Sequence, residues 1–134
     1  MPAHTNDLLP TFCAAAGVPL PEKPKVDGIS LLGVLQGGHP PADRGPLFWK
    51  YKSNPRPYNH NMQEELNPTE VVRWGPWKLL ARDGRPLELF NLKEDPYERW
   101  NLVRDEPKQV ERLRAVLDRW LAEPRPYRMP KTNW

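Results

Sequence analysis

The side chains that could carry out catalysis are few in this sequence of 134 residues, and they are scattered along it. The single cysteine, Cys13, stands beside Phe12 and a run of alanines. A buried structural thiol is expected there, because a nucleophilic cysteine needs a base and an activating environment. The three histidines, His4, His39 and His60, form no His-x-x-x-His pair and have no acidic neighbour at metal-ligand spacing. The sequence therefore predicts neither a catalytic residue nor a metal site in this chain.

Other common functional patterns are also missing from the sequence. Gly37-Gly38 is followed by His39-Pro40 and not by the start of a helix, so these glycines do not form a phosphate-binding loop. The 20 lysines and arginines balance 17 acidic residues and are interspersed with them, which gives a net charge of only +3. A nucleic-acid-binding protein more often has a dense basic stripe. Phosphate-loop chemistry and nucleic-acid binding are thus poorly supported.

The best candidate for a functional surface lies between residues 49 and 74, where cations alternate with aromatic residues. We select Lys50, His60 and Arg73 as the candidate substrate-binding residues. Cations beside aromatic rings suit an anionic, ring-containing ligand, through charge-assisted hydrogen bonds and stacking. In the alternative interpretation the aromatic rings pack in the core and the cations are solvated. The neighbouring aromatic residues are Trp49, Tyr51, Tyr58 and Trp74.

Four short apolar runs separated mainly by turn residues predict a small antiparallel sheet in this part of the chain. Asp83-Gly84 is the strongest hairpin signal among the turns. One face of such a sheet needs to be covered by another element. The predicted strands are residues 47–51, 71–74, 77–81 and 87–90.

The covering element is predicted at residues 105–122, where apolar residues recur at steps of three and four and charged residues lie between them. Two short helices are predicted before the sheet. Asp7 is the expected N-cap of the first, and Gly17 its end. Ser30 is the expected cap of the second helix. We therefore predict an α+β fold: two short helices, then a four-stranded antiparallel sheet covered by a C-terminal helix.

Composition divides the chain into four segments. We predict lead-in helices at 1–38, a linker at 39–45, the main subdomain at 46–122 and a proline-rich tail at 123–134. The 18 prolines are well over twice the usual share of about 5% and exclude one long helix. The sequence has no run of 18 apolar residues, and its first residues lack the basic and then apolar order of a signal peptide. We expect a soluble chain with no membrane span and no signal peptide, of unassigned compartment.

Seven short motifs, taken in order, resemble the C-terminal portion of type I sulfatases, the arylsulfatase-like enzymes of the alkaline phosphatase superfamily. Three of them resemble the family's R-x-G-x-W-K-L, E-L-Y-D-L and D-P-x-E-x-x-N-L elements. The order and spacing are those of the family, and the resemblance covers roughly residues 6–122. The motifs are residues 6–12, 16–18, 27–32, 47–51, 72–79, 88–92 and 95–102.

The resemblance implies that the catalytic machinery lies outside this chain. Members of the family use a formylglycine, made from the cysteine of a C-x-P-x-R motif, and a bound calcium, and these residues lie upstream of the part matched here. Cys13 has Ala15 and Gly17 in place of the proline and arginine of that motif, so it is not a formylglycine site. We expect no cofactor in this chain, with calcium and formylglycine implied for the parent sulfuric-ester hydrolase. The chain alone is expected to be inactive.

The resemblance implies a subdomain that helps to wall the substrate cleft and to recognise a sulfated small molecule or carbohydrate, through Lys50, His60 and Arg73. The expected partner is the missing catalytic domain, or a second copy that packs on the apolar N-terminal helices; nucleic acid and membrane are not expected. Two alternatives stay open. One is a stand-alone module that binds an anionic sugar or a protein, and the other is a binder of single-stranded nucleic acid with steeply salt-dependent affinity. The identity of the sulfate ester, and the choice between sulfate and phosphonate esters, also stay open.

Overall fold

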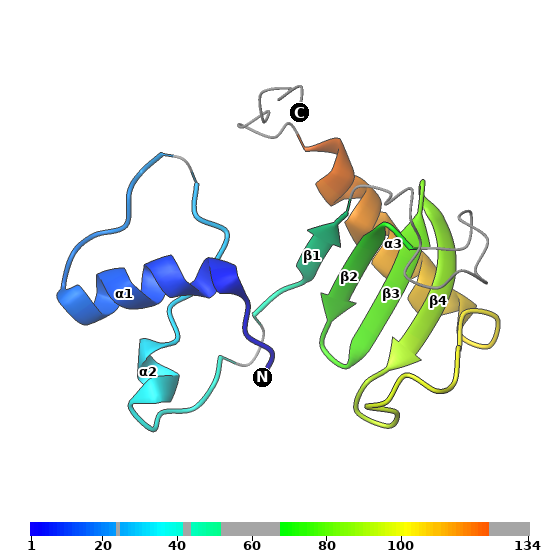
Figure 1. The fold of residues 1–134 in the computed structure, drawn as a ribbon, viewed down its shortest axis with the longest axis horizontal. Helices are drawn as coiled ribbons and strands as arrows, with labels where there is room; N and C mark the ends of the chain where they lie inside the picture. Colours follow the sequence, from blue (N-terminus) through cyan, green and yellow to red (C-terminus); the bar gives the residue numbers. More distant parts are fainter. Residues whose placement is uncertain (24, 42–43, 52–67, 124–134) are drawn as a thin grey trace, which may run out of the picture. The chain divides into compact units, whose positions relative to one another are not determined.

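A computed structural model describes residues 1–23, 25–41, 44–51 and 68–123 of the chain. The chain forms two compact units, one that includes Met1–Arg44 and one at Gly45–Pro124 (Figure 1). No helix in the described ranges is both long and apolar enough to cross a membrane. The predicted four-segment division stays a prediction, although one boundary between the two units falls at the end of the predicted linker.

The second unit is a four-stranded antiparallel sheet covered on one face by a helix. The strands β1 (Leu47–Lys50), β2 (Glu70–Trp74), β3 (Trp77–Arg82) and β4 (Arg85–Asn91) lie side by side in chain order. The helix α3 (Pro107–Ala122) crosses the back of this sheet in Figure 1. Together with two short helices in the first unit, this arrangement confirms the predicted α+β fold.

The strand register divides the side chains of the sheet between two faces. Val72 pairs with Leu79, and both lie on the face that packs against α3. The neighbouring pairs, Val71 with Leu80 and Arg73 with Lys78, therefore point to the other face, since successive side chains of a strand alternate. The face away from α3 thus carries a cation pair beside an apolar pair.

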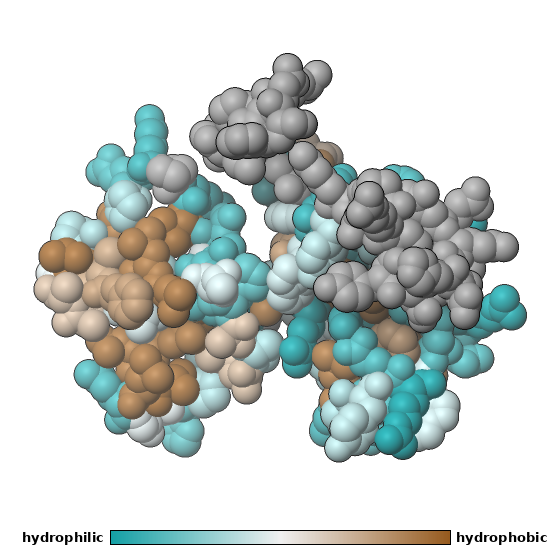
Figure 2. Space-filling view, viewed as in Figure 1, coloured by the Kyte–Doolittle hydropathy of each residue, from teal (hydrophilic) through white to brown (hydrophobic). Residues whose placement is uncertain are grey.

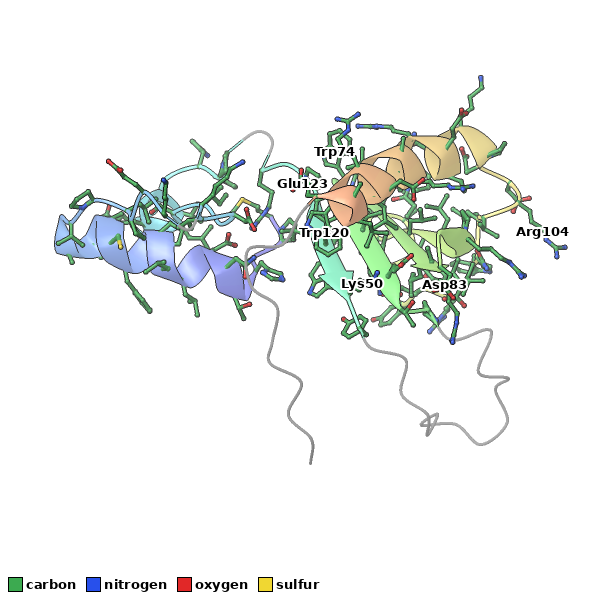
Figure 3. All side chains as sticks on the ribbon, turned by 90° about the horizontal axis from the view of Figure 1, so that it is seen from above. Lys50, Trp74, Asp83, Arg104, Trp120 and Glu123 are labelled. Carbon is green, nitrogen blue, oxygen red and sulfur yellow. The ribbon has the colours of Figure 1, made fainter. Side chains whose placement is uncertain are left out.

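The core of the second unit lies between the sheet and α3. The helix begins at Pro107, in the first turn, where the missing proline N–H removes no intrahelical bond. Trp120 stacks on Phe48 of β1 with ring centroids 4.8 Å apart, and the Arg112 guanidinium lies 4.3 Å from the ring of Trp74. Figure 3 shows Trp74 beside α3, the helix to which Trp120 belongs. The fully buried core residues are Val72, Leu79, Ala81, Leu89, Leu113 and Leu117.

The turn after β4 is held by two polar side chains. Asp95 accepts backbone N–H groups of Arg99 and Trp100 at 2.6 and 2.9 Å, and Asn101 accepts the Leu89 N–H at 3.1 Å. The Glu98 carboxylate lies in the same turn and accepts hydrogen bonds from a lysine side chain. Trp100, in the same turn, is 63% exposed.

The first unit contains a short 3₁₀ turn, η1 (Thr5–Asp7), followed by the helices α1 (Leu8–Ala16) and α2 (Leu32–Leu35). Gly17 ends α1 in the left-handed conformation, with φ of 66°, as its position predicted. Asp7 occupies the N-cap position of α1, but its side chain does not cap that helix. Instead its fully buried carboxylate accepts hydrogen bonds from both terminal nitrogens of Arg44, at 2.6 and 2.9 Å. The predicted cap is therefore the centre of a buried ion pair.

The first unit exposes an unusual amount of apolar surface. Figure 2 shows brown, apolar side chains gathered over α1 and α2. Phe12 is 65% exposed and Leu35 is 74% exposed. Contiguous apolar surface of this kind commonly marks an interaction site. The other exposed large apolar residues of this unit are Met1, Leu8, Leu9, Val18 and Leu20.

Candidate functional site

A pocket of about 390 Å³ lies on the face of the sheet that α3 does not cover. Its floor is built from the paired positions of β2 and β3 that the register turns to this face. Its rim comes from the end of β1, from Pro68 before β2, and from the turn after β4. The lining residues are Trp49, Tyr51, Pro68, Val71, Arg73, Lys78, Leu80, Leu92 and Glu98.

Arg73 supplies an unpaired donor to this pocket. Its Nε atom is buried and has no hydrogen-bond partner among the described residues. A buried donor that is left unpaired costs about 1–3 kcal/mol, and more for a charged group. An acceptor supplied by a ligand would remove that cost. Arg73 is therefore the group of this pocket best prepared to receive an anion.

Lys78 and Glu98 form an ion pair beside Arg73. The Lys78 Nζ atom donates to both carboxylate oxygens of Glu98, at 2.8 and 2.7 Å. Both side chains are partly exposed, at 25% and 34%. Lys78 lies directly opposite Arg73 across the two strands. Like charges in such positions repel, so Glu98 offsets the repulsion within the cation pair.

Aromatic and aliphatic side chains supply the rest of the lining. Trp49 at the end of β1 and Tyr51 just beyond it contribute rings, and Tyr51 is 56% exposed. Leu80 and Val71 give the floor an apolar section. An apolar lining with a few convergent polar groups is typical of small-molecule sites. The arrangement can bind a ligand that has both a ring and an anionic group.

The structure places the three predicted recognition residues differently. Arg73 lies in the pocket. Lys50 alternates with Trp49 along β1 and so lies on the other face of the sheet, where its Nζ atom is 3.4 Å from a carboxylate oxygen of Glu70. Figure 3 shows Lys50 at the end of its strand. His60 lies outside the described residues. The recognition role predicted for all three residues stays a prediction, and only Arg73 is placed in this pocket.

Two pocket residues were not selected from the sequence as binding residues. Lys78 lies two residues after Pro76, and its alternation with Trp77 and Leu79 places it on the face away from the core. Glu98 is 20 positions further along the chain, and no local pattern connects it to Lys78. The pairing depends on the turn after β4 and is visible only in three dimensions.

A second hollow of about 340 Å³ lies in the first unit and includes Arg44 and His39 among its lining residues. The terminal nitrogens of this arginine are already engaged, because both bind Asp7 and one also donates to the Pro2 carbonyl at 2.9 Å, while its Nε, like that of Arg73, has no partner among the described residues. This hollow is a weaker candidate than the pocket around Arg73.

The described residues do not suit the cofactors of a sulfatase active centre. No group of three or more histidine, cysteine, aspartate and glutamate side chains in the described ranges could hold a metal ion. Cys13 lies in α1 and is followed by alanines, without the proline and arginine of the formylglycine motif.

Comparison with known proteins places this chain among the sulfatases. The sequence profile described as "N-sulphoglucosamine sulphohydrolase, C-terminal" matches residues 3–125. A Delta 4,5-hexuronate-2-O-sulfatase of Bacteroides thetaiotaomicron is 33% identical over 124 residues, which is 87% of this chain and 23% of that protein. The chain thus spans about a quarter of this curated relative.

Solved structures agree with the sequence comparison. A 2-O GAG sulfatase superposes with a TM-score of 0.62 at 30% identity, over 86% of this chain and 24% of that one. A protein solved in complex with its substrate D-glucosamine-2-N,6-O-disulfate gives a TM-score of 0.60 at 28% identity, over 85% and 23% of the two chains. The chain belongs to the N-sulphoglucosamine sulphohydrolase C-terminal family and corresponds to the C-terminal portion of a sulfatase.

Proposed function

We propose that this chain is the substrate-recognition wall of a sulfuric-ester hydrolase and that its pocket binds a sulfated carbohydrate. The observation that carries the proposal is the guanidinium of Arg73, a residue that lines the pocket and whose buried Nε has no hydrogen-bond partner among the described residues. Sulfate oxygens accept charge-assisted hydrogen bonds from a guanidinium. The names of two similar proteins, one a hexuronate sulfatase and one solved with a disulfated glucosamine, supply the carbohydrate class.

The aromatic rim supports a sugar in particular. Trp49 and Tyr51 line the same pocket as Arg73. Aromatic rings combine a large apolar face with polar edges, so they can pack against the C–H face of a pyranose while its hydroxyls stay hydrated. A small alkyl sulfate would use Arg73 but not this rim.

The proposal assigns catalysis to polypeptide outside the described residues. The calcium and formylglycine of the family belong, on this proposal, to the parent enzyme, because the described side chains neither cluster as metal ligands nor carry the formylglycine motif. The purified chain should therefore not hydrolyse an aryl sulfate, with or without added calcium. Calcium-dependent turnover by this chain would overturn the proposal.

The exposed apolar surface of α1 and α2 is proposed to pack against that catalytic part. Phe12, 65% exposed, and Leu35, 74% exposed, each gain roughly 1.5–3 kcal/mol when fully buried. Without its partner, the chain should self-associate through this surface. Phe12→Lys should then reduce association in sedimentation, whereas Tyr97→Lys, at an exposed aromatic residue of the second unit, should not. A wild-type chain that stays monomeric at high concentration would refute this part.

The pocket is tested by NMR titration of the full chain with D-glucosamine-2-N,6-O-disulfate. The Nε–H signal of Arg73 and the amide signals of β2 and β3 should shift on binding. Arg73→Gln should weaken binding at least tenfold, as expected for the loss of a charge-assisted hydrogen bond. The matched control is Arg114→Gln, which removes an equal charge from a 53% exposed position on α3. Equal affinities for the two variants would overturn the assignment of Arg73.

A further inference from the structure

We infer that the turn after β4 provides a second sugar subsite, so that the chain binds a sulfated oligosaccharide more tightly than a single sulfated sugar. The side chains that form this subsite are Tyr97, Arg99 and Trp100. The inference rests on the proposed function, since it assumes that the pocket around Arg73 binds the first sugar. It adds a neighbouring sugar that carries an anionic group.

The large apolar side chains that the second unit exposes within the described ranges are all aromatic. They are Tyr51, which lines the pocket, and Tyr97 and Trp100 on the turn after β4. The first unit, in contrast, exposes mainly aliphatic side chains. A tyrosine or tryptophan ring combines a flat apolar face with a polar edge, so it can stack on the C–H face of a pyranose. The exposed surface of the second unit therefore favours a sugar as its ligand.

The turn that carries Tyr97, Arg99 and Trp100 is held in one conformation. One carboxylate oxygen of the buried Asp95 accepts the backbone N–H groups of Arg99 and Trp100. The backbone N–H of Glu98 donates to the Asp95 carbonyl at 3.3 Å. Rings that project from a fixed backbone lose little conformational entropy on binding, so this turn is preorganised for a ligand.

The same turn forms one wall of the pocket. Leu92 and Glu98 line the pocket, and the Glu98 carboxylate accepts hydrogen bonds from Lys78 on the open face of the sheet. Tyr97 and Arg99 are the chain neighbours of Glu98, so their Cα atoms lie about 3.8 Å from its Cα atom. A sugar chain that leaves the pocket past Glu98 therefore reaches these side chains next.

Arg99 supplies the cation of the subsite. The carbon at the centre of its guanidinium lies 5.0 Å from the centre of the Tyr97 ring, and both side chains are exposed. A guanidinium that stacks on a ring keeps its N–H donors in its own plane, where an oxyanion can accept them. Sulfate esters and uronate carboxylates share this chemistry, so the neighbouring sugar is expected to carry one of them.

The test is an NMR titration of the full chain with D-glucosamine-2-N,6-O-disulfate and with tetrasaccharides that begin with this sugar. The other residues are glucose in one tetrasaccharide, glucuronate in the second and glucose 6-sulfate in the third. Each tetrasaccharide should shift the indole N–H signal of Trp100, and the monosaccharide should not. The glucose form should bind roughly threefold more tightly than the monosaccharide, and the better anionic form roughly tenfold more tightly. The tighter anionic form identifies the anion that the subsite accepts.

Two substitutions of Trp100 separate ring stacking from general apolar contact. Trp100→Phe keeps a flat ring and should retain the gain in affinity. Trp100→Leu keeps the apolar bulk without a ring and should weaken tetrasaccharide binding roughly threefold. Neither variant should change the affinity for the monosaccharide. Equal tetrasaccharide affinities of the two variants would overturn the stacking role and indicate a protein partner instead.

Arg99→Gln tests the anion contact. The variant should bind the better anionic tetrasaccharide roughly threefold more weakly and the glucose form unchanged. The matched control is Arg114→Gln, which removes the same charge from an exposed position on α3. Equal losses of affinity in the two variants would show that only the overall charge matters, and would overturn the assignment of Arg99.

The outcomes separate this inference from the proposed function. If no saccharide shifts the Nε–H signal of Arg73, the proposed function fails and this inference fails with it. If the monosaccharide shifts that signal but the tetrasaccharides bind no more tightly and leave the Trp100 signal unchanged, only the second subsite fails. If a variant does not fold, as its amide spectrum would show, the comparison of saccharides on the wild-type chain decides alone.

Discussion

Protonation of Asp7 is expected to destabilise the first unit of the chain as the pH falls from 4 to 2. The carboxylate is completely buried and accepts four hydrogen bonds. Two come from the terminal nitrogens of Arg44, one from the His4 N–H at 2.7 Å and one from the Ile29 N–H at 3.1 Å. These bonds join residues that are up to 37 positions apart in the sequence. Loss of the charge should therefore loosen the whole unit.

The pKa of Asp7 sets the size of the effect. Burial by itself would raise this pKa, but the Arg44 side chain, the backbone N–H groups of Ile29 and His4, and the Arg44 charge together lower it from 3.8 to about 2. A shift of this size is worth on the order of 2 kcal/mol. Ionisation favours the folded state, so the contribution is fully present above about pH 5. It decreases as the pH falls through 4 and is lost below about pH 2.

The two units can be followed separately in one sample. No tryptophan occurs in residues 1–44, so tryptophan fluorescence reports on the rest of the chain. The amide signals of Ile29 and Leu31, whose N–H groups bind Asp7 and Thr11 side chains, report on the first unit. In urea titrations between pH 5 and pH 2, the midpoint from these amides should fall by the equivalent of about 2 kcal/mol.

Asp7→Asn provides the decisive control for this prediction. It keeps the shape of the side chain but removes the titrating group, so the variant should be less stable at pH 6 and its first unit should lose this component of the pH dependence. Asp27→Asn, at an exposed acid, should behave like the wild type. The reasoning is refuted if the wild-type amide midpoint is the same at pH 5 and pH 2, or if Asp7→Asn loses as much stability as the wild type over that range.

Further substitutions test the packing of both units. Gly28→Ala should destabilise the first unit by about 2 kcal/mol or more, because a Cβ there would collide with the backbone of Asn6, whereas Gly33→Ala has open space and should be tolerated. Leu117→Ala should cost about 2–5 kcal/mol in urea unfolding followed by fluorescence, since Leu117 is 1% exposed between α3 and the sheet. Leu35→Ala, at a 74% exposed position, should change stability by less than about 0.5 kcal/mol. A large loss from Gly33→Ala, or a small one from Leu117→Ala, would contradict the packing described.

The sheet and its covering helix were predictable because their signals are local. Asp83-Gly84 specifies a two-residue turn, and both residues adopt positive φ, at 48° and 73°. A type I′ turn needs positive φ at both central residues, and aspartate and glycine tolerate that conformation better than most other residues. The apolar residues of α3 likewise recur at helical spacing, which by itself predicts an amphipathic helix. Its buried residues, Leu113 and Leu117, are four positions apart.

The pairing of distant charges was not predictable. Asp7 has the features of a helix N-cap, and nothing near it in the sequence indicates Arg44, 37 positions later. Lys78 and Glu98 are likewise joined only because the turn after β4 returns the chain to the sheet. The type of a residue determines which interactions its side chain can make, but the residue with which it interacts depends on the tertiary fold. The candidate site was therefore only partly predictable, with Arg73 placed in the pocket and Glu98 missed.

Glu98 does not contribute net stability to the folded chain. Its backbone has φ of 56°, and left-handed geometry costs a residue other than glycine roughly 1–2 kcal/mol. Its ion pair with Lys78 is partly exposed, and such pairs contribute about 0–1 kcal/mol. The ion pair therefore does not offset the free-energy cost of the left-handed backbone. A glycine at this position would adopt the same backbone conformation without that cost. What a glycine could not supply is a negative charge beside Arg73 and Lys78, which leaves one excess positive charge among the described residues that line the pocket.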